Sequence, residues 1–249
     1  MAITIKKDKH IESMKIACKI NAQALELLEK HIKPGISTKE LDQIAFDFLK
    51  SKGAIPSFKG YGGFPASICA SINNQLIHGI PSDTILKDGD IVSLDIGTYI
   101  NGFHGDAART FPVGNVSDEA LKLIEVTRQC FFEGIKYAKV GNYLYGISEA
   151  IQNYVESNGF YIVTDYVGHG IGKNLHEEPE VPNFKPFGKK GPKLLKGMTL
   201  AIEPMVNVGT KDIKVLDDGW TVVTRDGSLS AHYENTILIT DNEPEILTL

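Results

Sequence analysis

The chain has 249 residues, of which 42% are hydrophobic and 23% are charged, and its net charge at pH 7 is −5. This composition is sufficient for a large core, built as one large domain or as two fused halves. The acidic balance gives no sign of a nucleic-acid-binding surface, and because no apolar run reaches about 18 residues we expect no membrane span.

Cysteine usage and the first residues both favour a cytoplasmic protein. The three cysteines, Cys18, Cys69 and Cys130, are widely separated and form neither a CxxC pair nor a zinc-ribbon spacing. A reducing compartment suits this pattern best. The opening residues, MAITIKKDKH, become polar almost at once, so we expect no signal peptide.

The first part of the chain predicts two helices, a loop and a strand. Apolar residues at helical spacing favour a helix over residues 9–31, which Pro34-Gly35 ends. Ser37 and Glu40 have the spacing of a capping box that starts a second helix, and Gly53 ends it. Residues 58–65 (FKGYGGFP) form a loop of glycines and aromatics, residues 67–72 favour a strand, and residues 73–81 (NNQLIHGIP) follow as a connection.

The strongest local signal is a β-hairpin over residues 91–111. Asn101-Gly102 favours a type I′ turn, which places Asp95 opposite Ala108. Asp106 is then the diagonal neighbour of Asp95 on the same face, at roughly 7–8 Å between α-carbons; a slipped turn would place the two directly opposite. Two carboxylates on one face repel each other. The pair therefore marks either a solvent-exposed face or a site for a multivalent metal.

The second part of the chain predicts two more helices and three strands. Ser117 is placed to cap a helix that runs to about residue 138. A fourth helix is expected over residues 146–158, followed by Gly159. Residues 177–195 are rich in Lys, Pro and Gly and favour a loop. Strands are expected near residues 199–206, 220–224 and 231–239.

The two parts of the chain repeat one another at a near-constant offset, which indicates two related halves. The order is kept and the paired residues are chemically alike: Lys33, Gly35, Leu41, Phe48, Leu49, Ser51 and Gly53 align with Lys139, Gly141, Ile147, Tyr154, Val155, Ser157 and Gly159, and His78 aligns with His176. Chance identity in short windows is the alternative. The second half should then carry acids of its own, and Glu203 and Glu234 are the candidates because each lies in an apolar strand.

Four carboxylates, Asp95, Asp106, Glu203 and Glu234, are thus expected to meet between the halves. They cannot all stay ionised in a partly buried cleft without cations, and two divalent ions would cancel their charge. His169, between two glycines, offers an imidazole, although a lone histidine can also be an ordinary core or surface residue. Oxygen ligands with one nitrogen suit Mn, Fe(II) or Co, or else Zn.

The ordered set of these five residues resembles the metal ligands of the methionine aminopeptidases. The resemblance extends from about residue 9 to residue 249, and its motifs are HGIP (78–81), NGFHGDAART (101–110), GHGIGKNLHEEP (168–179), TLAIEPM (199–205) and SAHYENT (230–236). It implies an α+β pita-bread fold, with two pseudo-symmetric halves, a curved antiparallel sheet covered by helices, and the metal site between the halves. We expect one catalytic domain over residues 1–249, with a repeat of roughly 10–115 and 116–249. The compact length implies a bacterial-style type I enzyme.

The resemblance implies a metal-dependent hydrolase that removes the initiator methionine of nascent proteins when the second residue is small. Asp106 and Glu234 would bridge two divalent ions, Asp95 would chelate one, and His169 with Glu203 would bind the other. A water activated by the ions would attack the scissile carbonyl, and Glu203 would also carry its proton to the leaving amine.

Two further histidines are implied to act without binding metal. His176 would stabilise the oxyanion, and His78 would contact the scissile amide or the leaving group. The alternative for both is that they support the ligands.

The resemblance also places an apolar slot for the methionine side chain. Its residues are Tyr61, Phe64, Cys69 and Trp220, whose rings and thiol suit a thioether; ordinary core packing is the alternative. Leu175 lies nearby, where an aromatic residue is common in close relatives, so the slot is expected to be reshaped there. Cys18 and Cys130 are expected in the core.

The expected partners are the N-termini of nascent polypeptides and the ribosome near its exit tunnel, with no nucleic-acid readout and no membrane, and the expected state is a monomer. Two alternatives remain open. One is an Xaa-Pro aminopeptidase or prolidase of the same fold, and the other is a non-catalytic peptide- or ribosome-binding homologue.

Overall fold

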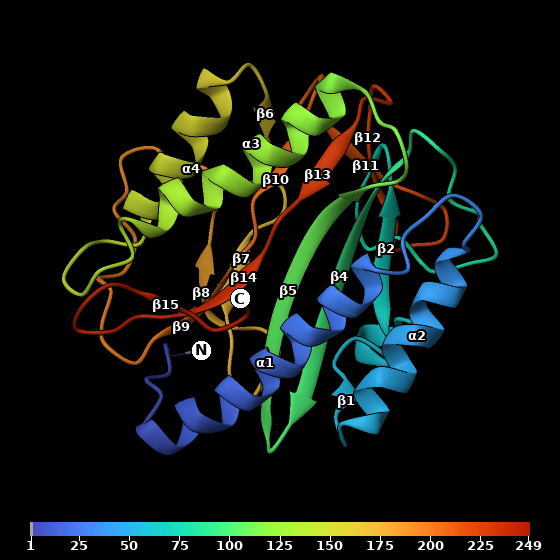
Figure 1. The fold of residues 1–249 in the computed structure, drawn as a ribbon. Coiled ribbons are helices and arrows are strands. Elements are labelled where there is room, and N and C mark those ends of the chain that lie inside the picture. The colour runs from blue at the N-terminus through green and yellow to red at the C-terminus, as the bar shows by residue number, and fades with distance from the viewer. Residues whose placement is uncertain (1) are drawn as a thin grey trace.

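Four α-helices cover one side of a layer of antiparallel strands in the computed structural model, which describes residues 2–249 (Figure 1). The helices are α1 (Asp8–Glu29), α2 (Thr38–Ser51), α3 (Asp118–Ile135) and α4 (Tyr145–Ser157). The predicted caps are confirmed: the Ser37 side chain accepts from the Glu40 amide at 3.2 Å while Glu40 Oε2 accepts from the Ser37 amide at 2.8 Å. Ser117 accepts from the Ala120 amide at 3.2 Å. Each cap satisfies an otherwise unpaired amide of the first turn, which defines where the helix begins.

The longest strand pair is the predicted hairpin, formed by β4 (Ile91–Ile100) and β5 (Phe103–Pro112). Both turn residues have positive φ, 54° at Asn101 and 81° at Gly102, as a type I′ turn requires. Asp95 lies opposite Ala108 and Asp106 lies opposite Gly97, so the expected diagonal arrangement is confirmed and the slipped register is wrong. The two carboxylates therefore share one face of the hairpin.

The other strands are shorter and pair antiparallel in four hydrogen-bonded sheets. Their bounds are β1 (Ile55–Pro56), β2 (Ile68–Ile72), β3 (Gln75–Ile77), β6 (Tyr161–Ile162), β7 (Gly168–Gly170), β8 (Glu177–Val181), β9 (Thr199–Ile202), β10 (Met205–Asn207), β11 (Ile213–Val215), β12 (Val222–Thr224), β13 (Ser230–His232), β14 (Asn235–Leu238) and β15 (Glu245–Ile246). These strands correct the sequence analysis in two ways. β3 lies in the expected connection 73–81, and β8 lies in the expected loop 177–195. The strands expected near 199–206 and 231–239 are each divided in two, so Glu203 and Glu234 lie between strands rather than within them. A short 3₁₀ turn, Tyr61–Gly63, interrupts the loop of glycines and aromatics.

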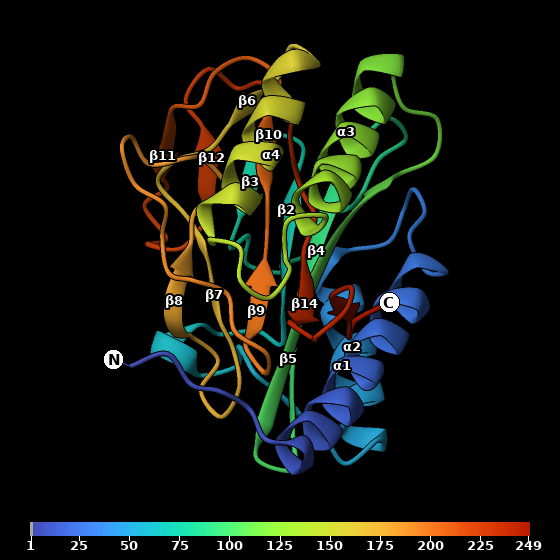
Figure 2. The same cartoon turned by 90° about the vertical axis from the view of Figure 1, so that its left-hand side faces the viewer.

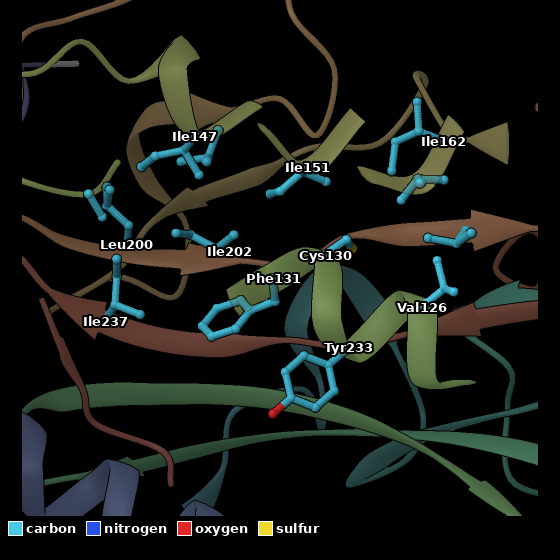
Figure 3. Packing of buried hydrophobic residues seen from close by; sticks show 14 of the residues in the cluster. Val126, Cys130, Phe131, Ile147, Ile151, Ile162, Leu200, Ile202, Tyr233 and Ile237 are labelled. Carbon is cyan, nitrogen blue, oxygen red and sulfur yellow. The ribbon is translucent and has the colours of Figure 1, made fainter. Parts of the chain in front are cut away.

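Each pair of helices covers its own hydrophobic cluster. Helices α1 and α2 pack on β2 and β4 around Leu28, Leu41 and Leu94, whereas α3 and α4 pack on β9 and β14. Figure 3 shows Phe131 and Ile151 from the second helix pair facing the strand residues Leu200, Ile202 and Ile237. This packing fixes the strands from the helix side, so that the residues on their opposite face keep defined positions.

Close contact between helix and hairpin depends on one glycine. A Cβ at Gly105 would lie 2.8 Å from the Cys18 sulfur of α1, so only glycine lets α1 pack this closely on β5. Cys18 and Cys130 are both fully buried, as expected. Figure 2 shows α1 running beside β5 with the C-terminus close to it. Within residues 2–249, no helix has both the length and the apolar character that a bilayer crossing needs.

Candidate active site

One cavity of about 170 Å³ contains every site residue that the sequence analysis named. Its walls come from strands and loops of both parts of the chain. Its lining residues are Phe58, Tyr61, Phe64, Cys69, His78, Asp95, Asp106, His169, Leu175, His176, Glu203, Trp220 and Glu234. Acidic and imidazole groups therefore meet an apolar wall in a single space, which is the usual make-up of a small-molecule or peptide site.

The candidate ligands are presented by five different segments. Asp95 lies on β4, Asp106 on β5 and His169 on β7, while Glu203 directly follows β9 and Glu234 lies between β13 and β14. Hydrogen bonds tie the hairpin to the second half of the chain at this point. The Thr236 hydroxyl donates to the Asp106 carbonyl at 2.9 Å and accepts from the Asp106 amide at 3.0 Å. The backbone that carries the acids is thus held rigidly from both halves.

The spacing of the polar atoms leaves room for a cation. Ligand atoms of Asp106, His169 and Glu234 all lie within 4.8 Å of one another. His169 Nε2 is 3.6 Å from Glu203 Oε1 and 4.0 Å from Asp106 Oδ2, which is too far for strong direct hydrogen bonds. The atoms converge on a common point without pairing with each other.

Several carboxylate oxygens in the cavity are buried without a hydrogen-bond partner. Among residues 2–249 these include Asp95 Oδ1, Asp106 Oδ1 and Glu234 Oε1. Burial raises the pKa of Asp95, and burial together with the charges of neighbouring carboxylates raises the pKa of Asp106, Glu203 and Glu234. Buried acids of this kind are costly to ionise unless a cation compensates them. The unpaired oxygens and the donor types therefore fit divalent metal ions.

His169 has the protonation state that a metal ligand needs. Burial, and secondarily the nearby His176, lowers the pKa of His169 to about 3, so its imidazole is neutral. Its Nδ1 lies 2.8 Å from the Gly170 carbonyl, which places the ring proton on Nδ1. The lone pair of Nε2 then faces the carboxylates and is free for a cation.

His176 and His78 also line the cavity. The His176 ring lies 4.3 Å from the His169 ring, centroid to centroid, and its Nδ1 is 2.8 Å from the Tyr61 hydroxyl. Burial lowers the pKa of His78 to about 4, and the ring stands edge-on to Tyr166. His78 also has a φ of 58°, an unusual backbone conformation for a residue other than glycine.

The apolar wall is built around Phe64 and Trp220, whose rings meet edge to face at 5.2 Å between centroids. Cys69 is buried beside them, and burial raises the pKa of its thiol well above the ordinary value, so it is uncharged. Leu175 is also buried, while Tyr61 remains about half exposed at the mouth. The wall thus offers rings and one neutral sulfur to a bound side chain.

Two residues of the site were not singled out from the sequence. Phe58 lines the cavity, and its position at the start of the loop of glycines and aromatics was an available signal. His232 is fully buried, and its Nε2 lies 3.8 Å from Glu203 Oε2. In the strand expected near 231–239, alternation would put His232 on the same face as Glu234, two residues later, so the approach of His232 to the acids also had a sequence signal.

Comparisons with known proteins agree on one family. The model of metallopeptidase family M24 matches residues 12–241. A methionine aminopeptidase of Clostridium perfringens is 60% identical, and the match covers 99% of each chain. The crystal structure of a methionine aminopeptidase from Rickettsia prowazekii is similar with a TM-score of 0.97 and 41% identity over 100% of both chains. A prolidase from Pyrococcus furiosus, at 24% identity over 98% of this chain and 65% of its own, has a TM-score of 0.81 and shares the fold.

Proposed function

The chain belongs to the methionine aminopeptidases of metallopeptidase family M24, with their pita-bread fold, and we propose that it removes the initiator methionine of nascent proteins when the second residue is small. The enzyme class is a metal-dependent exopeptidase. The observation that carries the proposal is the single cavity in which the acid–histidine cluster meets an apolar slot. The slot can hold a methionine side chain while the adjacent peptide bond lies at the polar end.

The metal-binding residues in this proposal are Asp95, Asp106, His169, Glu203 and Glu234, which would hold two divalent ions chosen among Co, Mn, Fe(II) and Zn. Support comes from the unpaired buried oxygens and from the converging ligand atoms of the cluster. When bound, the ions would supply Lewis acidity, which polarises the scissile carbonyl and lowers the pKa of water.

The side chains around the scissile bond have different roles in the reaction. Glu203 accepts the proton of the attacking water and passes it to the leaving amine, a role that suits a carboxyl whose pKa burial raises. With the Tyr61 hydroxyl donating to His176 Nδ1, the proton of the neutral imidazole lies on Nε2. His176 can donate it in a hydrogen bond to the oxyanion that develops on the carbonyl. His78 contacts the scissile amide or the leaving group.

Specificity in this proposal comes from Tyr61, Phe64, Cys69 and Trp220. Aromatic rings attract a thioether sulfur, and an unbranched side chain fits a narrow slot better than a branched one. Leu175 is buried in the lining of the same cavity and occupies less space there than an aromatic ring would. Methionine is the residue that combines the length and the sulfur this wall favours.

We further propose that residues 1–249 form one catalytic domain with an internal repeat of roughly 10–115 and 116–249. The two helix pairs, each over its own hydrophobic cluster, support this division. The cellular setting that we propose is the cytoplasm, with a monomer acting on nascent chains near the ribosomal exit tunnel and no nucleic-acid readout. Three free cysteines among the described residues fit a reducing compartment.

The experiment for the metal roles replaces Glu234 by alanine. Calorimetric titration with Mn²⁺ and release of methionine from a peptide are measured on the same preparations. The proposal expects Glu234→Ala to lose both tight Mn²⁺ binding and activity, because the carboxylate holds ions at the centre of the cluster. Full activity of this variant with saturating Mn²⁺ would overturn the assignment.

A further inference from the structure

The guanidinium of Arg109 is fixed at the seam between β5 and the segment that carries Glu234. Its Nη1 donates to two backbone carbonyls, that of Ala108 at 2.8 Å and that of Glu234. Its Nη2 donates to Asn235 Oδ1 at 2.6 Å and to the Thr248 carbonyl at 3.2 Å. A planar guanidinium can serve four acceptors at once only when all of them keep their positions, so this fork is geometrically demanding.

The surroundings of this cation are unusual because no acid among the described residues lies close enough to form an ion pair with it, although the Glu234 carboxylate is near enough to interact with its charge. Within residues 2–249, no carboxylate forms an ion pair with Arg109. The guanidinium instead stacks over the Tyr233 ring, 4.3 Å from its centroid, and burial lowers the pKa of Arg109. A partly buried charge that contacts only neutral groups is costly to place. The position of Arg109 is therefore better explained by the groups that its hydrogen bonds hold in place than by pairing with an acid.

Glu234 depends on these hydrogen bonds because it belongs to neither neighbouring strand. It lies between β13, which ends at His232, and β14, which begins at Asn235. Its amide donates to the Ala108 carbonyl at 2.9 Å, and its own carbonyl accepts from Arg109. Both polar backbone groups of this residue are thus anchored on β5, one directly and the other through the guanidinium. The direction of the Glu234 side chain follows from that anchoring.

We propose that Arg109 is a positioning residue that holds the Glu234 backbone so that its carboxylate points into the cavity to bind divalent ions. The inference rests on the proposed metal role of Glu234. Arg109 acts through its fork of hydrogen bonds, from the groove of about 350 Å³ between α1 and α3. Its charge also attracts the Glu234 carboxylate, and a lysine variant separates the two effects. A lysine at this position keeps the charge but cannot reproduce the fork.

The test is the affinity of metal-free protein for Mn²⁺, measured by calorimetry. We expect Arg109→Met to weaken binding by about 10- to 100-fold, the usual effect of removing a residue that orients a ligand. Arg109→Lys should weaken Mn²⁺ binding to a similar extent. The matched control is Arg128→Met: Arg128 lines the same groove, but it pairs with Glu125 at 3.1 Å on the surface of α3, and its loss should leave the affinity unchanged.

Two further variants separate positioning from general loss of stability. Leu28→Ala removes a fully buried side chain in the other hydrophobic cluster, so it should lower the melting temperature and leave Mn²⁺ affinity unchanged. Asn235→Ala removes one acceptor of the fork and leaves Arg109 in place. It should weaken Mn²⁺ binding by several-fold, and it serves as the test if Arg109→Met does not fold.

The outcomes are distinct. An Arg109→Met affinity within about twofold of the unmodified protein overturns the inference, and so does full rescue by lysine or an equal loss of affinity in Leu28→Ala. The Glu234→Ala titration tests the underlying proposal separately. If Glu234→Ala loses Mn²⁺ and Arg109→Met does not, only the role of Arg109 fails; if Glu234→Ala keeps Mn²⁺, the metal role of Glu234 fails.

Discussion

Asp95 and Asp106 are diagonal neighbours on one face of the β4–β5 hairpin, since Asp95 lies opposite Ala108 and Asp106 opposite Gly97. One oxygen of each carboxylate is buried without a hydrogen-bond partner. The fold therefore brings two like charges together in a place where water cannot separate them. Cations are the natural compensation, and the arrangement has consequences for stability that can be measured.

The first prediction concerns removal and return of metal. Metal-free protein should melt at a lower temperature than protein with Mn²⁺, because an ion that binds only the folded state stabilises it by about 2.7 kcal/mol at 100 times its dissociation constant. The Asp106→Asn substitution removes the repulsion between the carboxylates of Asp95 and Asp106 and also removes one proposed metal ligand. Metal-free Asp106→Asn should melt above metal-free unmodified protein and should not respond to Mn²⁺. If calorimetry shows that Mn²⁺ leaves the melting temperature of the unmodified protein unchanged, the metal assignment is contradicted.

The second prediction concerns His176. His176→Ala should lower kcat by about 10²- to 10³-fold, the usual cost of losing one oxyanion donor, with the number of bound ions unchanged. Tyr61→Phe, which removes only the hydroxyl beside His176 Nδ1, should cost about fivefold. If titration shows that an ion is lost with the His176 side chain, the residue is a ligand and its proposed role is wrong.

The parts of this site that could be predicted are those with local sequence signals. The Asn101-Gly102 turn determines the register of the hairpin by itself, and the register places Asp95 and Asp106 on one face. The caps at Ser37 and Ser117 act within one helical turn. The meeting of Glu203 and Glu234 with the hairpin was predicted from the proposed internal repeat, which supplies long-range information that single segments lack.

The strands that were missed have partners far away in the chain. Glu177–Val181 contains a proline and three acids, so it has little strand propensity of its own, but it pairs with β7. Gln75–Ile77 is too short to show alternation and is stabilised by pairing with β12. The hydrogen bond from Arg109 to the Glu234 carbonyl could not be predicted from the sequence either, because it depends on how two separate segments meet.

The third prediction concerns a buried ion pair beside His176. Lys6 Nζ lies 2.6 Å from Glu177 Oε2, and both side chains are almost fully buried. Lys6→Met should cost about 3 kcal/mol of unfolding free energy at pH 7, because it leaves the Glu177 charge buried without its cation. The hydrogen bonds from Thr4 and the Asn174 amide to Glu177 remain and limit the loss. Lys39 forms an exposed pair with Asp83, so Lys39→Met should change the free energy of unfolding by less than about 0.5 kcal/mol. Urea denaturation with equal losses in both variants would contradict this account.

The same pair makes stability depend on pH on the acid side. Burial acts to raise the pKa of Glu177, but hydrogen bonds from Lys6 and Thr4 outweigh it and hold that pKa below its ordinary value. A depressed carboxyl pKa contributes stability above the unfolded pKa, about 4.3, and this stability is lost as the pH falls through the folded pKa. Lys6→Met should therefore show a shallower loss of stability below about pH 4.3 than the unmodified protein. An unchanged slope in that range would show that Lys6 does not depress the pKa of Glu177.

The fourth prediction isolates the sulfur contact in the apolar slot. Norleucine has the shape of methionine without the sulfur, and a sulfur–aromatic contact is worth about 0.3–1.5 kcal/mol. Trp220→Leu should therefore reduce the preference in kcat/KM for a methionine over a norleucine peptide by roughly 2- to 10-fold. The matched control, Phe187→Leu, changes a fully exposed ring that does not line the cavity and should leave the ratio unchanged. An unaltered ratio in Trp220→Leu would exclude this ring from the slot.

The central claim is tested most directly by release of the first residue from two peptides, Met-Ala-Ser and an Xaa-Pro peptide, with Mn²⁺ or Co²⁺ and with a chelator. The account predicts free methionine from Met-Ala-Ser only when metal is present, and little or no cleavage of the Xaa-Pro peptide. Cleavage of Met-Ala-Ser that persists in the chelator, or a preference for the Xaa-Pro peptide, would contradict it.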